Sequence, residues 1–192
     1  MIILSYKERV TMNYKTDKEL LDALSAPFPA EDLDWRVSYA DANKDGKVFA
    51  SMVAYIDARA VQNRLDKVCG TGGWWNQPPQ YSTVGNGVNQ GITIKLPETG
   101  EVTKWDGADQ TDIEAVKGGL SGAFKRAAVL WGIGRYLYDI EQAYVTPQLD
   151  KPQDMDGWLR THIKIGGRKQ VYYIKKPKLP EKFLPKESTN VA

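Results

Sequence analysis

The chain has only one cysteine and one histidine among its 192 residues, and this excludes both an intrachain disulfide and a complete Cys/His zinc site. A single thiol, Cys69, cannot form an intrachain disulfide, which favours a reducing compartment. Cys69 and His162 together cannot complete a zinc site, which needs four ligands. A Cys–His nucleophile pair is formally available, but a buried thiol and a surface histidine are the simpler interpretation.

Long apolar runs, nucleotide-binding loops and a large net charge are also absent. No apolar run reaches the roughly 18 residues that span a bilayer, and the first ten residues lack the ordered regions of a signal peptide. No G-x-x-x-x-G-K-[ST] sequence is present to support a P-loop ATPase. The net charge is only +2. Nucleic-acid binding must therefore be inferred from where the charged residues lie, and not from their total. We expect a soluble, cytoplasmic protein with no cofactor, metal or membrane partner.

Local patterns predict an α+β fold. A capping box at residues 16–19 opens a short helix, and Asp57 caps a second one that runs to about Val68. Strands are predicted where β-branched and aromatic residues gather between turn residues: at 48–56, 88–96, 101–105, 161–165 and 169–174. The last two strands flank Gly166 and Gly167, which predicts a hairpin.

The clearest helix is predicted from the capping box at 111–114 to about Trp131. Gly118, Gly119 and Gly122 lie in its middle, and each costs roughly 1 kcal/mol relative to alanine in a helix. Close approach by another backbone would offset this cost. That backbone could belong to a sheet of the same chain, a neighbouring subunit or a nucleic-acid strand.

Three cations, Lys117, Lys125 and Arg126, lie on or beside the side of this helix that its apolar stripe leaves open. Cations on a rigid helix bind phosphates without reading bases, although a solvated helix face is the alternative interpretation. The C-terminal segment mixes cations, Lys169 among them, with Tyr172 and Tyr173. That mixture suits a surface that follows a nucleic-acid backbone, or a charged strand edge that blocks aggregation.

Two further clusters have alternative interpretations. The pair Trp74–Trp75 could stack on bases, but we expect at least Trp74 to lie in the core. The acidic cluster contains Asp106, Asp109, Asp112 and Glu114. A Mg²⁺-dependent nuclease would use such carboxylates, whereas Asp112 and Glu114 also suit the first turn of a helix, where they complement its dipole.

Several segments together resemble the Rad52/22 family of double-strand-break repair proteins. Tyr55-Ile56, followed by a helix and the sequence GTGGW at 70–74, is similar to its first signature. EAVKGGLSGAFKRAAVLWGIGRYLY, at 114–138, is similar to its second. The lead-in WDGA at 105–108 is typical of the short phage and bacterial members, of the Sak and DdrA type. The resemblance covers roughly residues 26–145.

The resemblance implies a curved antiparallel β-sheet packed on a long α-helix, in subunits that assemble into an oligomeric ring or arc. It implies annealing of single-stranded DNA, with duplex ends as a secondary ligand. Lys125 and Arg126 match the family's phosphate-binding Lys-Arg pair. The chain departs from eukaryotic members at three positions. Those members have an aromatic residue in place of Thr71, a third basic residue in place of Val129, and a basic residue in place of Ala60. The DNA-binding residues expected are Lys125, Arg126, Lys117, Arg59, Arg64, Arg135 and Lys169.

The expected organisation is a flexible arm at 1–15, an annealing core at 16–145, and a basic hairpin with a flexible tail at 146–192. We predict a non-enzymatic protein that anneals complementary strands without ATP in recombination and repair. The expected partners are single-stranded DNA, copies of the chain itself, and an exonuclease or a host single-strand-binding protein. The compact form suggests a phage-encoded protein acting in the bacterial cytoplasm. The alternatives are the nuclease above and a passive coat for single strands or RNA.

Overall fold

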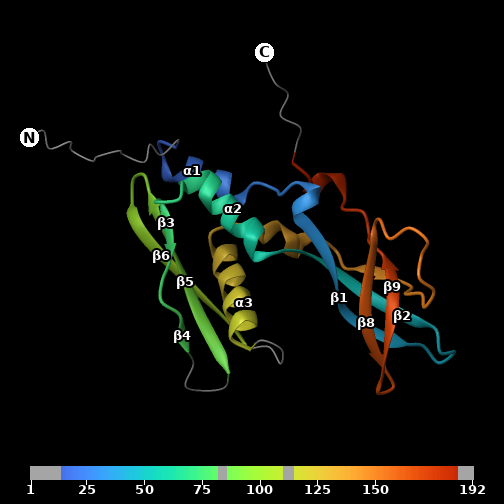
Figure 1. Ribbon diagram of the computed structural model, residues 1–192. Coiled ribbons are helices and arrows are strands. Elements are labelled where there is room, and N and C mark those ends of the chain that lie inside the picture. Colours follow the sequence, from blue (N-terminus) through green and yellow to red (C-terminus); the bar gives the residue numbers. More distant parts are fainter. Residues whose placement is uncertain (1–13, 82–85, 110–114, 186–192) are drawn as a thin grey trace, which may run out of the picture. The chain divides into compact units, whose positions relative to one another are not determined.

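The computed structural model describes residues 14–81, 86–109 and 115–185, and their contacts divide the chain into two compact units (Figure 1). The described part of the first unit comprises residues 14–26, 57–81, 86–109 and 115–135, and that of the second comprises 27–56 and 136–185. Helices and antiparallel sheets are both present, so the predicted α+β class is confirmed. The ring and the curvature of the sheet stay predictions.

Two helices of the first unit begin at the caps that the sequence predicts. The capping box of α1 (Asp17–Ser25) is complete: Thr16 Oγ1 accepts from the amide of Glu19, and the Glu19 carboxylate accepts from the amide of Thr16. Helix α2 (Ala58–Cys69) begins where the Asp57 carboxylate accepts from the amide of Ala60 at 2.8 Å. The two helices pack together and bury their apolar sides, including Leu20, Leu24, Val61 and Leu65.

The sheet of the first unit has β5 (Gly87–Leu96) at its centre. Strand β6 (Gly100–Asp109) pairs with its whole length, and the short strands β3 (Trp74–Asn76) and β4 (Gln80–Tyr81) also pair with it. All pairings are antiparallel. The predicted strands at 88–96 and 101–105 are therefore confirmed, and β6 extends four residues further.

Helix α3 (Ala115–Leu130) lies against β5 and β6 (Figure 1). The core between them consists of buried apolar residues from both layers: Val88, Ile92, Ile94, Ala123, Phe124 and Ala127. A Cβ added at Gly122 would lie 3.0 Å from the Cβ of Ala108 on β6. Gly122 is thus closely approached by a strand of the same chain, although the contacting atom belongs to the side chain of Ala108 and not to the backbone that the sequence predicted. The second capping box, at 111–114, lies outside the described residues.

The second unit is built on the antiparallel sheet β1–β2–β7, in that order. Strands β1 (Leu33–Ala42) and β2 (Val48–Ile56) form a hairpin, and β7 (Ala143–Val145) pairs with β2. The strand predicted at 48–56 is confirmed, and β1 and β7 are additions to the prediction. Short 3-10 helices occur at η1 (Ala30–Asp32), η2 (Arg135–Asp139) and η3 (Glu181–Phe183).

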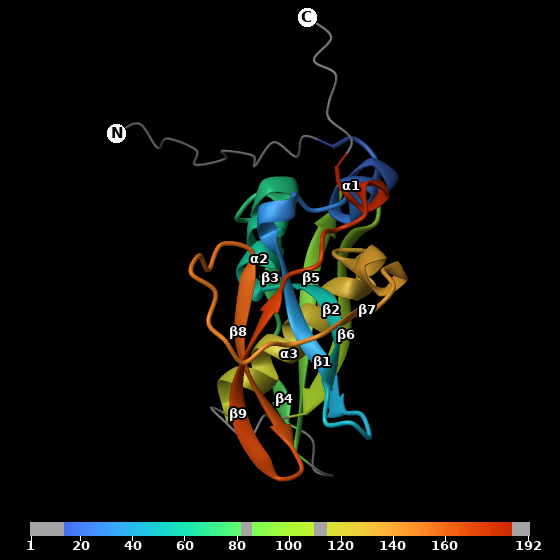
Figure 2. The ribbon, with the colours of Figure 1, turned by 90° about the vertical axis from the view of Figure 1, so that its right-hand side faces the viewer.

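A second hairpin, β8 (Trp158–Ile165) and β9 (Arg168–Lys175), packs beside β1 and completes the core of this unit (Figure 2). Its turn residues Gly166 and Gly167 both have positive φ, at 53° and 83°, as the predicted two-residue hairpin requires. The buried cluster joins both hairpins and consists of Trp35, Ala50, Met52, Ile163, Tyr172 and Ile174. No helix among the described residues is long and apolar enough to cross a membrane.

Candidate nucleic-acid interface

The two cations in the middle of α3 point in different directions. Consecutive residues of a helix project about 100° apart, so Lys125 and Arg126 do not share one line along α3. The Arg126 Nε lies 3.1 Å from Asp106 Oδ1 on β6, which directs the guanidinium towards the sheet. The side chain remains 55% exposed. Arg126 is therefore accessible to solvent, and its nearest anion is a carboxylate of the protein.

Lys125 stands among small residues. Its helical neighbours three and four positions away are Ser121, Gly122, Ala128 and Val129, which are all small or short. Lys125 is half-buried, and of its neighbours Ala128 is buried and Gly122 packs against Ala108 of β6. Lys117 is exposed about 12 Å nearer the start of α3, since each helical residue advances 1.5 Å. These two lysines and Arg126 are the cations of α3.

Arg135 stabilises the carboxyl end of α3. Its Nε and Nη2 donate to the carbonyl of Val129 at 3.0 and 2.7 Å, and Nη2 also donates to the carbonyl of Leu130 at 2.9 Å. The Val129 carbonyl also accepts from the amide of Gly132 at 3.0 Å. A cation at this end of the helix complements the helix dipole. The geometry gives Arg135, predicted as a DNA contact, a structural role.

Sequence reasoning overlooked Lys104, which lies at the same end of α3. Its Nζ donates to the carbonyl of Leu130 at 3.0 Å and lies 4.3 Å from the centre of the Trp131 ring. Burial, followed by repulsion from Arg135, lowers the pKa of Lys104 below its usual value. No local sequence pattern could indicate this contact, because Lys104 lies 26 residues before the carbonyl that it contacts.

Arg64 also contacts a helix end. Its Nη1 donates to the carbonyls of Leu24 at 3.1 Å and Ala23 at 3.4 Å, and to that of Ala26, all at the end of α1. Arg59, predicted beside it, is exposed in the first turn of α2. The structure therefore ties Arg64 into the packing of α1 on α2 and leaves the side chain of Arg59 at the surface.

Lys169 belongs to the other unit. It is exposed on β9 and lies directly opposite Lys164 of β8. The seven predicted residues therefore occur on both units, with Lys117, Lys125 and Arg126 on α3, Arg59 and Arg64 on α2, and Arg135 just beyond α3.

The first tryptophan of the Trp74–Trp75 pair has a packing role. The Trp74 ring lies 6.2 Å from that of Phe124 on α3, and its Nε1 donates to Asp66 Oδ1 at 2.7 Å. Both tryptophans are half-buried, and Trp75 pairs with Thr93 across β3 and β5. This arrangement agrees with the expectation that Trp74 serves the core.

The sequence offers two candidate catalytic features, an acidic cluster that could hold a metal ion and the thiol of Cys69. In the part of the chain that the structure describes, no three His, Cys, Asp or Glu side chains lie close enough together to hold a metal ion. Asp106 is paired with Arg126, and Asp112 and Glu114 of the predicted cluster lie outside the described residues. Burial, with a smaller effect of Asp66, raises the pKa of the Cys69 thiol to about 12, so it is a poor nucleophile at neutral pH.

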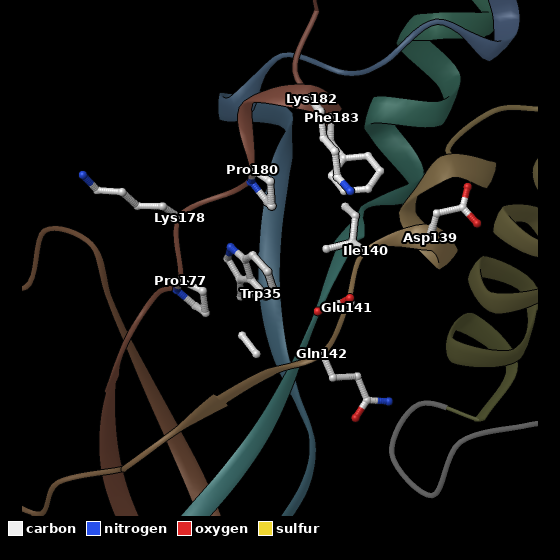
Figure 3. Close-up of a pocket in the computed structure, with 11 residues that line it drawn as sticks. Trp35, Asp139, Ile140, Glu141, Gln142, Pro177, Lys178, Pro180, Lys182 and Phe183 are labelled. Atoms are coloured by element: carbon white, nitrogen blue, oxygen red, sulfur yellow. The ribbon is translucent and has the colours of Figure 1, made fainter.

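A cavity of about 420 Å³ lies within the second unit (Figure 3). Apolar groups form much of its wall, including Trp35, Pro177, Pro180 and Phe183. Its charged lining residues are two acids and two lysines: Asp139, Glu141, Lys178 and Lys182. Because these charges balance, the lining has no excess of cations, and the cations of α3 are the better candidate for binding phosphates.

Comparison with known proteins identifies related sequences. The family model described as "Rad52/22 family double-strand break repair protein" matches residues 16–156. The chain is 37% identical over 127 residues to the single-stranded DNA-binding protein DdrA of Deinococcus radiodurans, over 63% of this chain and 55% of that protein. It is 32% identical over 142 residues to DdrA of Deinococcus deserti, over 71% of this chain and 68% of that protein. The match thus spans about half the length of the first relative.

Proposed function

Because the chain belongs to the Rad52/22 family of double-strand break repair proteins, we propose that it binds single-stranded DNA and anneals complementary strands. The match over residues 16–156 carries this proposal, and the names of the two DdrA relatives support the choice of single-stranded DNA. Annealing of this kind is part of recombination and double-strand break repair. The protein acts without ATP and performs no covalent step. Neither the nuclease nor the passive coat has support from a comparison.

The proposed contacts are electrostatic. Lys125 and Arg126 bind successive phosphates, and Lys117 extends the path towards the start of α3. Phosphate contacts of this type hold a strand without reading its sequence, so the bases stay available to a complementary strand. Base pairing, and not the protein, then selects the partner strand.

Self-assembly completes the proposal. A single copy of α3 offers few phosphate contacts, and several copies on one strand would add their contacts together. We propose a homo-oligomer, as a ring or an arc, in the cytoplasm of a bacterium, encoded by the cell or by a phage. Duplex ends are a secondary ligand. An exonuclease or a host single-strand-binding protein would supply or hold the strands.

The experiment is an annealing assay with two complementary labelled oligonucleotides. The double variant Lys125→Ala/Arg126→Ala should lose annealing and keep the oligomeric state of the unchanged protein. The matched control, Lys67→Ala/Lys95→Ala, removes two exposed cations from α2 and β5 and should anneal normally. Unchanged annealing by the α3 variant would refute this assignment. Cleavage of labelled DNA in the presence of Mg²⁺ would instead favour a nuclease.

A further inference from the structure

The net positive charge of the chain depends on one hairpin. Residues 158–175 contain five cations and no aspartate or glutamate: Arg160, Lys164, Arg168, Lys169 and Lys175. Of the 26 Lys and Arg, 21 therefore lie elsewhere, together with all 24 Asp and Glu. The chain without this hairpin would have a negative net charge, so the hairpin is the part that an anionic polymer would meet most favourably.

The strand register places these cations on one face of the hairpin. Ile163, Tyr172 and Ile174 point into the core of the second unit and are buried. Because neighbouring residues alternate between faces, the other face carries every second residue. Its members are Trp158, Arg160, His162 and Lys164 on β8, and Lys169, Val171, Tyr173 and Lys175 on β9. Arg160, Lys164, Lys169 and Lys175 are exposed. We call these eight residues the outer face.

The arrangement of charge on the outer face opposes folding. Lys164 and Lys169 lie directly opposite each other, and like charges in that position destabilise a strand pair. Among the described residues, the four exposed cations have no carboxylate or hydrogen-bond partner for their side chains. By contrast Lys176, just after β9, pairs with Asp34 at 2.8 Å. A surface that served only solubility would avoid this repulsion by mixing charges of both signs.

Two aromatic rings lie between these cations. Tyr173 pairs with Arg160 across the hairpin, and Trp158 pairs with Lys175. Both rings are half-buried. Alternate residues of a strand are about 7 Å apart, so cations and rings recur along the outer face at short, regular intervals. Cations that follow a backbone, beside rings on which bases stack, are the combination that holds single-stranded nucleic acid.

Resting on the strand-binding function above, we propose that the outer face is a second binding surface for single-stranded DNA, separate from the cations of α3. Lys164, Lys169, Arg160 and Lys175 contact phosphates, and Trp158 and Tyr173 stack on bases. An acidic protein segment would use the cations and leave the rings without a function, which is why DNA is the favoured ligand. Annealing brings two strands to one protein, and a second surface would give it contacts for both.

The test is the salt dependence of binding. Affinity of the full-length variant Lys164→Gln/Lys169→Gln for an oligo-dT probe is measured by fluorescence anisotropy at several NaCl concentrations. Each lost phosphate contact reduces the slope of log K against log salt by roughly 0.7 for single strands, so we expect a reduction of about 1.4. The thermal midpoint should stay unchanged or rise, because a repulsive pair is removed.

The matched control is Lys44→Gln/Lys47→Gln, which removes two exposed lysines from the β1–β2 turn of the same unit. Its salt slope should equal that of the unchanged protein. Ultraviolet cross-linking to a bromodeoxyuridine oligonucleotide provides a second measurement and should label the peptide that contains Trp158 or Tyr173. A hairpin variant with an unchanged slope, or cross-links confined to the first unit, would overturn the inference.

Two further outcomes separate this inference from the proposed function. If annealing depends on Lys125 and Arg126 while the hairpin variant behaves as the unchanged protein, the function stands and the second surface is rejected. If instead the hairpin variant keeps its DNA affinity but loses binding to a poly-glutamate probe, the outer face serves an acidic protein partner, and the DNA assignment is wrong. If the unchanged protein binds no oligo-dT, both proposals fail.

Discussion

The Nε of Arg126 lies 3.1 Å from Oδ1 of Asp106, and this ion pair joins α3 to β6. The two side chains are 55% and 26% exposed, so water screens their attraction. Ion pairs at such a surface contribute about 0–1 kcal/mol to stability. A phosphate could therefore replace the carboxylate at little cost. Asp106 acts on this interpretation as an internal competitor of the DNA strand.

Replacing Asp106 should consequently strengthen DNA binding. The variant Asp106→Asn keeps an oxygen that can accept from the amide of Gly107, a bond of 2.7 Å in the structure, but removes the charge that holds Arg126. We expect tighter binding of oligo-dT and a change of at most about 1 kcal/mol in the free energy of unfolding. The control Asp109→Asn makes the same change of charge on the other face of β6, at an exposed residue. Weaker binding by the Asp106 variant alone would contradict the competition.

The packing of Trp105 on Gly91 gives a second prediction. The two residues face each other on β6 and β5, and a Cβ added at Gly91 would lie 2.7 Å from Cε2 of the Trp105 ring. Gly91→Val should lower the free energy of unfolding by about 1–3 kcal/mol, since the ring must move. Urea denaturation measures the loss. Adding Trp105→Ala should recover part of the loss caused by Gly91→Val, whereas strictly additive effects would show that the ring is not the obstacle.

Arg64 should matter for stability more than for DNA. Its side chain bonds carbonyls at the end of α1, and hydrogen bonds from charged groups contribute about 1.5–3 kcal/mol. Arg64→Ala should therefore lower the urea midpoint while the folded protein keeps its affinity for oligo-dT. The comparison variant is Arg59→Ala, an exposed position on the same helix, which should be stable. A stable Arg64 variant with weakened DNA binding would restore the assignment made from the sequence.

Cys69 should make stability depend on pH in alkaline solution. Burial raises the pKa of this thiol from 9.0 to about 12, so the folded protein retains a proton that the unfolded chain releases. Its contribution is complete below pH 9 and is lost as the pH rises from 9 towards 12. At pH 8, Ellman's reagent should react slowly with the folded protein and rapidly in urea. The variant Cys69→Ala should lose the thiol-dependent part of the alkaline decline in stability, and an identical pH profile would contradict this cause.

Elements with local signals were predictable from the sequence, and contacts across the chain were not. The cap at Asp57 and the turn at Gly166 and Gly167 each involve a few neighbouring residues, so their patterns identified α2 and the β8–β9 hairpin. Strand β7 has three residues and depends on pairing with β2, more than 80 residues earlier. No local pattern marks such a strand.

In the candidate site, too, local features could be predicted from the sequence and long-range contacts could not. The Lys125–Arg126 pair was found because it lies in a long, specific stretch of sequence. The groups of the protein that contact the candidate arginines could not be predicted from the sequence. Asp106 lies 20 residues before Arg126, and the carbonyls that Arg64 contacts lie about 40 residues before it. Residue type alone cannot distinguish an arginine that binds phosphate from one that stabilises a helix end, because the same donors serve both.

Each unit is assembled from separated segments, and this has a consequence for truncation. The family match ends at residue 156, two residues before β8 begins. A fragment ending there would lack Ile163, Tyr172 and Ile174, which cover Trp35 and Met52 in the core of the second unit. Its apolar sheet would meet water, and aggregation would follow. The family match therefore ends inside a folding unit. A protein shortened to the matched residues would lack part of the core of its second unit.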